Sequence, residues 1–145
     1  MEDDPRTTRA ACTQISMTCT TSMTDWVHGD LWLCTDGLLR RSRGWRATMS
    51  NVDNRGAKQI VDAREVRPTA FTTEERMQIA ASDKRNWWIS WDQIAEAKLG
   101  YGPISLGIRL TLTDGRRISF RWFQGEGGMD LLKAAMSPIL GARLS

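Results

Sequence analysis

Apolar and polar residues alternate along two neighbouring segments near the end of the chain. In residues 108–113 and again in residues 117–122, an apolar side chain occupies every second position. Asp114 and Gly115 separate the two segments, and this pair favours the tight turn of a β-hairpin. The pattern therefore predicts two antiparallel strands, each with one buried and one solvent-facing side.

A helix is predicted to follow this hairpin. From Met129 onward, apolar residues recur at spacings of three and four, which is the repeat of an amphipathic helix. Asp130 lies in the first turn, where a negative charge interacts favourably with the helix dipole, and Pro138 is expected to kink or end the final turn. The apolar stripe is expected to cover an open corner of the sheet. Its members are Leu131, Leu132, Ala135, Met136 and Ile139.

An earlier hairpin is predicted in the first third of the chain. Residues 29–34 alternate as a strand, residues 35–37 (Thr-Asp-Gly) form a tight turn, and residues 38–46 form the returning strand. Gly, and to a lesser degree Asp, tolerates the positive φ angles that such short turns need. Leu31 and Leu33 are expected on one face of the first strand, and Trp32 and Cys34 on the other.

One short helix and a further strand segment are predicted between the hairpins. Thr72 and Glu75 match a capping box, in which each side chain accepts a hydrogen bond from the backbone of the other residue. The helix is expected to end at residues 83–86. Residues 88–99 are predicted to form a strand pair or a bulged strand, and residues 100–103 form the next turn.

Two parts of the chain lack a clear period. Residues 1–24 are rich in Thr and Ser, and we expect a disordered or extended tail there, with Met17 or Met23 as an alternative natural start. In residues 47–71, the segment 59–66 fits either a short strand or a short helix. Residues 25–145 are expected to form one domain.

Together these segments predict a mainly β fold of the α+β class. It is a bent antiparallel β-sandwich or partly open barrel of about seven strands, capped by a C-terminal α-helix, with one extra short helix in the middle. A chain of 145 residues, 41% apolar and 26% charged, suits one globular domain. Among seven tryptophans, Trp87, Trp88 and Trp91 are expected to pack in the core and at its rim.

The cysteines and the lengths of the apolar runs indicate the cellular compartment of the protein. Cys12, Cys19 and Cys34 are odd in number and form no Cys-x-x-Cys motif, so they are interpreted as free thiols in a reducing compartment. No apolar run is long enough for a transmembrane helix, and the first 24 residues lack the apolar centre of a signal peptide. The expected location is the cytoplasm, with peripheral attachment to a membrane surface as the further option.

Three segments resemble the bacterial pleckstrin-homology-like domains related to GRAM domains. Residues 29–40 read Gly-Asp-Leu-Trp-Leu-Cys-Thr-Asp-Gly-Leu-Leu-Arg and resemble the first hairpin of that family. Residues 89–94 (Ile-Ser-Trp-Asp-Gln-Ile) are similar to a later strand segment, and the hairpin through residues 112–115 completes the order. The resemblance covers about residues 26–142. It implies a bent sandwich plugged by its last helix and a non-enzymatic domain that binds phosphoinositides, peptides or proteins, or forms oligomers.

The candidate residues for catalysis fit simpler roles. His28 is the only histidine and has no Ser or Cys partner in a nucleophile motif, and its spacing from the cysteines matches no zinc pattern. Asp36 and Asp114 suit their turns. Residues 125–128 (Gly-Glu-Gly-Gly) are interpreted as a flexible joint, because a phosphate loop would continue with Lys and Ser or Thr. We therefore expect no catalytic activity, metal or cofactor.

Basic residues concentrate on the two hairpins. Arg41 and Arg43 share one face of their strand, with Arg40 on the other, whereas Arg117 and Arg121 share the outer face of the last hairpin. Arginine forks match phosphate and carboxylate oxygens, so these positions form a candidate surface for an anion or a partner. The alternative is a solvated face whose charges discourage aggregation. The candidate surface comprises Arg40, Arg41, Arg43, Trp45, Arg46, Arg117 and Arg121.

The sequence thus predicts a binding or assembly module. The expected partner is another protein or a second copy of the chain, engaged through a strand edge or the Arg/Trp surface. The alternative is peripheral binding to anionic phospholipid through the arginine clusters, which high salt would weaken. Nucleic acid is not expected, because the net charge is only +3 and no recognised module is present.

Overall fold

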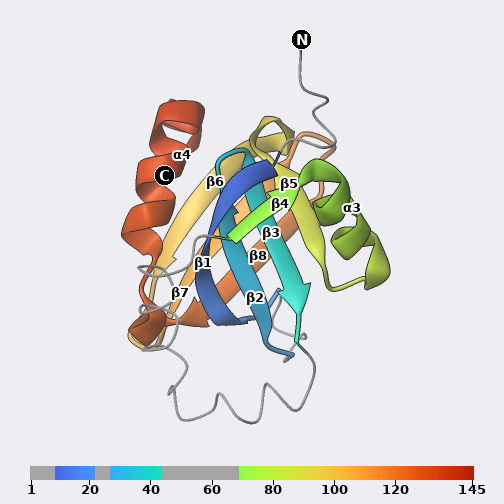
Figure 1. Ribbon diagram of the computed structural model, residues 1–145. Coiled ribbons are helices and arrows are strands. Elements are labelled where there is room, and N and C mark those ends of the chain that lie inside the picture. Colours follow the sequence, from blue (N-terminus) through green and yellow to red (C-terminus); the bar gives the residue numbers. More distant parts are fainter. Residues whose placement is uncertain (1–8, 22–26, 44–68) are drawn as a thin grey trace.

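The computed structural model describes residues 9–21, 27–43 and 69–145, which form eight strands in two antiparallel sheets (Figure 1). The first sheet has the strand order β4-β1-β2-β3-β5, and the second has the order β6-β7-β8. The strands are β1 (Arg9–Cys19), β2 (Gly29–Cys34), β3 (Gly37–Ser42), β4 (Thr69–Thr72), β5 (Trp87–Ser90), β6 (Ile94–Tyr101), β7 (Ser105–Leu112) and β8 (Arg117–Phe123).

Two α-helices of the described chain lie on opposite sides of the sheets in Figure 1. They are α3 (Thr73–Ser82) and α4 (Met129–Leu140). Short 3-10 turns are η1 (Trp91–Gln93), η2 (Gln124–Glu126) and η3 (Gly141–Arg143). The predicted fold class, a helix-capped antiparallel sandwich or partial barrel with one extra short helix, is confirmed.

Both predicted hairpins are present. In the first, β2 and β3 pair around the turn at Thr35 and Asp36. In the second, β7 and β8 pair without a register shift, and Asp114 accepts a hydrogen bond from the N–H of Arg116 at 3.0 Å. The predicted capping box is also confirmed, because Glu75 N–H donates to Thr72 Oγ1 at 3.0 Å and Thr72 N–H donates to Glu75 Oε1 at 3.1 Å.

The expectation of a tail was wrong for residues 9–19. They form β1, which lies between β4 and β2 inside the first sheet. Register shifts around Ser16 interrupt the regular alternation that would have revealed a strand. Ser16 and Thr18 are buried because both hydroxyls donate to the buried carboxylate of Glu126, from Ser16 at 2.8 Å. The hydroxyl side chains of Ser16 and Thr18 therefore form an internal hydrogen-bond network with Glu126.

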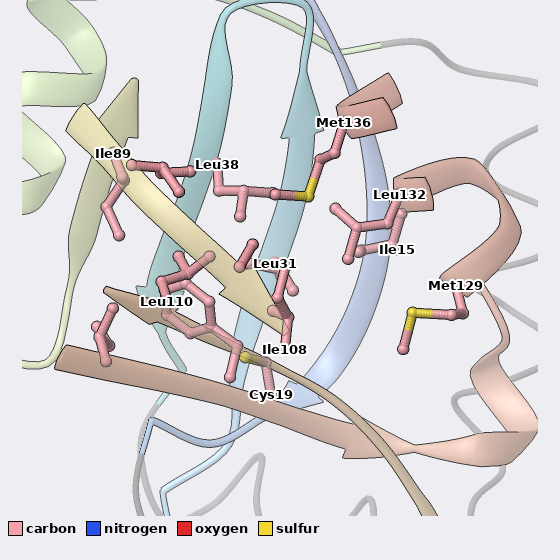
Figure 2. Packing of buried hydrophobic residues seen from close by; sticks show 14 of the residues in the cluster. Ile15, Cys19, Leu31, Leu38, Ile89, Ile108, Leu110, Met129, Leu132 and Met136 are labelled. Carbon is pink, nitrogen blue, oxygen red and sulfur yellow. The ribbon is translucent and has the colours of Figure 1, made fainter. Parts of the chain in front are cut away.

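The core lies between the two sheets and under α4 (Figure 2). Side chains from β1, β2 and β3 meet those from β7 and α4, and burial of this apolar surface is the main favourable contribution to folding. Labelled members in Figure 2 include Ile15, Leu31, Leu38, Ile108, Leu110, Leu132 and Met136. At the joint before α4, Gly128 has a φ of 92°, and a Cβ there would lie 2.9 Å from the Cβ of Ile15, so glycine is required.

The plug formed by α4 differs from the predicted stripe. Its buried residues follow a spacing of three, four and four, and the helix ends at Leu140, within the turn that contains Pro138. Leu131 and Ile139 are instead 44% and 42% exposed. Their assignment to the plug was wrong, because the face that meets the core is centred one residue further along the helix. The buried residues are Met129, Leu132, Met136 and Leu140.

The interpretation of the cysteines as three free thiols is also corrected. Cys12 and Cys34 lie directly opposite each other on β1 and β2, with their Cα atoms 4.0 Å apart, and form a disulfide. Cys19 is free and buried. The remaining predictions for residues 44–68, including the strand end, the turn and the segment 59–66, lie outside the described residues.

Candidate functional site

Arg40, a candidate arginine of the first hairpin, does not lie at the surface of the protein. Its side chain is fully buried, and its guanidinium donates to the carbonyl oxygens of Arg85, Cys19 and Val27 at 2.7, 2.8 and 2.6 Å. Such charge-assisted hydrogen bonds satisfy a buried cation and join distant segments. Including Arg40 in the candidate surface was wrong, because it is an internal brace.

Arg41 and Arg43 face a buried carboxylate. Their guanidinium groups lie 3.6 and 3.5 Å from the carboxylate of Asp30, which also accepts a hydrogen bond from Gln14 Nε2 at 2.7 Å. Burial raises the pKa of Asp30, and the positive charges of Arg43 and Arg41 oppose that rise. Arg41 also lies over the ring of Trp32, 5.3 Å from its centre. These two cations are therefore largely engaged within the protein.

Trp45 and Arg46, the remaining candidates near the first hairpin, lie outside the described residues. The candidate surface of the first hairpin is thus reduced, within the described chain, to the exposed parts of Arg41 and Arg43.

The candidates on the last hairpin are exposed and lie among further cations. Arg117 and Arg121 project from the outer face of the second sheet, where the strand register places Lys98 opposite Arg109 and Arg109 opposite Ser119. Directly opposed residues of antiparallel strands share a face, so these basic side chains form one outer surface. Within it, neighbouring glycines of β6 and β7 leave a hollow of about 240 Å³ that Lys98, Arg109 and Arg121 border.

A larger groove, of about 600 Å³, runs beside this hollow. On one side it is lined by the segment before β5 and by β5 itself, and on the other by β7 and β8. Trp87 and the buried Ile118 provide apolar surface in it. We call it the basic groove, and its cationic lining residues are Lys84, Arg85, Arg109, Arg117 and Arg121.

Most charges of the basic groove have no counter-charge among the described residues. Arg85 pairs with Asp83 at 3.0 Å, and its hydrogen bonds lower the pKa of that carboxyl to about 2. None of the salt bridges within residues 9–21, 27–43 and 69–145 involves Lys84, Arg109, Arg117 or Arg121, and no Asp or Glu is among the described lining residues. The groove therefore presents a positive potential to solvent.

The buried polar groups near β1 and β2 fit structural roles. Burial raises the pKa of the Cys19 thiol to about 12, against the opposing charge of Arg40, so the thiol stays protonated at neutral pH. Burial, and then the Arg40 charge, lowers the pKa of His28, whose ring packs edge-on to Phe123 at 5.7 Å. In the part of the chain that the structure describes, no three His, Cys, Asp or Glu side chains gather as a metal site would require.

Four groove and hollow cations were absent from the predicted surface: Lys84, Arg85, Lys98 and Arg109. The position of Arg109 could have been predicted from the sequence, because it occupies an outer position in the same alternating hairpin as Arg117. Lys84 and Arg85 follow a helix and reach the groove only through the packing of β5 beside the second sheet, which no local pattern indicates.

No family model matches the chain, and no curated protein matches it. None of the helices among the described residues is both long enough and apolar enough to span a membrane.

Proposed function

We propose that the protein is a non-enzymatic binding module that recognises an acidic segment of a partner protein in the basic groove. The observation that carries the proposal is the gathering of Arg109, Arg117 and Arg121 in a concave site without a described counter-charge. Arginine and tryptophan are the residue types that contribute most to protein interfaces when they are desolvated, and Trp87 supplies the aromatic surface here. Complementary charge would speed association and select acidic partners.

The order of the elements supports, as part of the same proposal, a pleckstrin-homology-like or GRAM-like domain. Two antiparallel sheets and a final helix that covers their corner agree with what that resemblance implies. The phosphate-binding arginines that such domains carry near their first hairpin have no free counterpart among the described residues of this one, where Arg40 is buried and Arg41 faces Asp30. The binding site is therefore proposed on the opposite sheet.

A cytoplasmic location remains part of the proposal. The Cys12–Cys34 disulfide counts against this location, because cytosolic thiols are normally kept reduced. Trapping thiols with an alkylating reagent at the moment of cell lysis tests the location: alkylated Cys12 and Cys34 agree with a reducing compartment, and a protected pair contradicts it.

The proposed function is tested with fluorescein-labelled poly-L-glutamate as the probe and fluorescence anisotropy as the readout. We expect saturable binding that weakens steeply between low and high salt, because exposed charges are screened by ions. Poly-L-lysine of the same length is the control and should not bind. Absence of binding to poly-L-glutamate at low salt would contradict the proposal.

A second candidate, attachment to anionic phospholipid, is favoured by one specific observation. Tyr101 and Ile104, at the β6–β7 turn, are 65% and 72% exposed. A second hollow, at this turn, is lined by both Tyr101 and Arg121, so an aromatic and a cationic side chain adjoin there. Sedimentation with phosphatidylserine vesicles tests this candidate: it requires that Ile104→Asp reduce pelleting, and equal pelleting of both proteins would reject it.

A further inference from the structure

Within the described residues, no strand pairs with one edge of the second sheet where it borders the basic groove. β8 is the last strand of that sheet, and on its free side the N–H and C=O of Arg121 bond to Thr20, at 3.0 and 2.8 Å. Successive residues of a strand direct these groups to alternate sides, so Arg117 and Ser119 direct theirs to the same side as Arg121. Among the described strands, none pairs with β8 at Arg117 or Ser119.

The opposite edge of this sheet shows the contrast. β6 is covered by the end of the chain, because Leu144 bridges Ala97 and the N–H of Leu99 donates to Ser145 at 2.9 Å. An open edge is a template for another strand, and proteins usually cover such edges or protect them. No described residue covers the β8 edge at Arg117 or Ser119 in this way, and a groove lined by arginines lies beside it.

The two faces of the β8 edge differ in character. Arg117, Ser119 and Arg121 lie on the outer face, together with Arg109. Ile118 points to the inner side, where Trp87 lines the same groove. Because directly opposed residues of paired strands share a face, an added strand would need acidic side chains opposite the arginines and an apolar side chain next to Ile118.

We infer that the basic groove binds an extended peptide that pairs antiparallel with β8 at Arg117–Ser119 and alternates acidic and apolar residues. This inference rests on the proposed function and specifies its ligand. Main-chain hydrogen bonds to Arg117 and Ser119 hold the peptide, the arginines select its acidic residues, and Trp87 with Ile118 contacts its apolar ones. The pairings between the described strands are all antiparallel, and the peptide continues that pattern.

The test uses the full chain and a labelled peptide of alternating Glu and Val, measured by fluorescence anisotropy. In antiparallel pairing, Arg117 and Ser119 exchange hydrogen bonds with the residues directly opposite them, which are the Glu residues. N-methylation of the Glu nitrogens should therefore weaken binding about tenfold or more, because it removes donors that face β8. N-methylation of the Val nitrogens, which face away, leaves the charge and composition equal and should change the affinity little.

A matched pair of protein variants tests the same edge from the other side. Ser119→Pro removes an N–H that points away from β7, a position where edge strands tolerate proline, whereas Ser119→Ala keeps it. We expect loss of peptide binding in the first variant and retention in the second, with cooperative thermal unfolding of both as the check on folding. If Ser119→Pro does not fold, the two N-methylated peptides decide alone.

The outcomes separate this inference from the proposed function. Equal binding of both N-methylated peptides, with poly-L-glutamate still bound, would overturn strand addition. The proposal that the basic groove binds an acidic segment would be unaffected. Failure of poly-L-glutamate and of the peptide together would overturn both. Tighter binding to phosphatidylserine vesicles than to the peptide, abolished by Ile104→Asp, would also overturn the inference in favour of a membrane surface.

Discussion

The described arginines of the first hairpin lie close to groups that use their charge, whereas Arg117 and Arg121 of the last hairpin border an open groove. Arg40 donates to three carbonyl oxygens, and Arg41 and Arg43 share one buried carboxylate. Arg117 and Arg121 are exposed and have no such partner among the described residues. The difference indicates that the acceptors facing an arginine, more than its spacing in the sequence, distinguish an arginine engaged within the fold from one whose charge is available to a ligand.

A further buried arginine shows the same principle in α3. Arg76 is fully buried, donates to Asp36 Oδ2 at 2.8 Å and lies 3.8 Å from the centre of the Trp88 ring. It thereby fastens α3 to the Thr-Asp-Gly turn of the first hairpin. A guanidinium can be buried at tolerable cost only when its donors are used. Here Asp36, the carbonyl oxygen of Thr72 and the hydroxyl of Thr73 accept them, and the ring of Trp88 packs on the guanidinium plane.

The largest expected effect is on stability at the first hairpin. Arg40→Leu removes the donor from three carbonyl oxygens, in two buried hydrogen bonds and one partly buried one, so the free energy of unfolding should fall by roughly 3–5 kcal/mol. Urea denaturation followed by tryptophan fluorescence measures this change. The matched variant Arg109→Leu, at an exposed position of the groove, should change stability by less than about 0.5 kcal/mol. Similar losses in both variants would break the comparison between the two hairpins.

A somewhat smaller effect is expected from reduction of the disulfide that joins β1 to the first hairpin. The bond closes a sequence separation of 22 residues, and a loop of this size stabilises a fold by roughly 3 kcal/mol. Unfolding with and without dithiothreitol measures the loss. The Cys12→Ala/Cys34→Ala protein should match the reduced protein and be insensitive to the reagent, and a reductant-sensitive variant would contradict the assignment of this pair.

A still smaller effect concerns pH. Because the pKa of Asp30 is raised in the folded protein, the folded state holds this proton more tightly than the unfolded state. The associated stability is fully present below the ordinary pKa of an aspartic acid and is lost as the pH rises through the raised value. Chemical denaturation at a series of pH values should show this decline in wild type and its absence in Asp30→Asn. A difference curve that rises with pH over the same interval would contradict the burial of this carboxyl.

The sequence allowed the two hairpins, the capping box and the last helix to be predicted because local periods and turn residues determine them. β1 was not predicted, because register shifts interrupt its alternation of apolar and polar residues. The burial of Ser16 and Thr18 also depends on Glu126, which lies more than a hundred positions away in the sequence. Alternation had already placed Arg40 on the face opposite Arg41, which was a usable sign of its burial. The approach of Lys84 to β8 depends on tertiary packing and left no local signal.

We propose that the last hairpin, and not the first, presents the binding cations. The most direct measurement compares the affinity for labelled poly-L-glutamate of two double variants with equal loss of charge, Arg117→Gln/Arg121→Gln and Arg41→Gln/Arg43→Gln. We predict that the first variant unfolds like wild type and loses about tenfold or more in affinity. The second should bind within about twofold of wild type, because Asp30 already engages its cations. Equal losses in the two variants, or a larger loss in the second, would contradict the account.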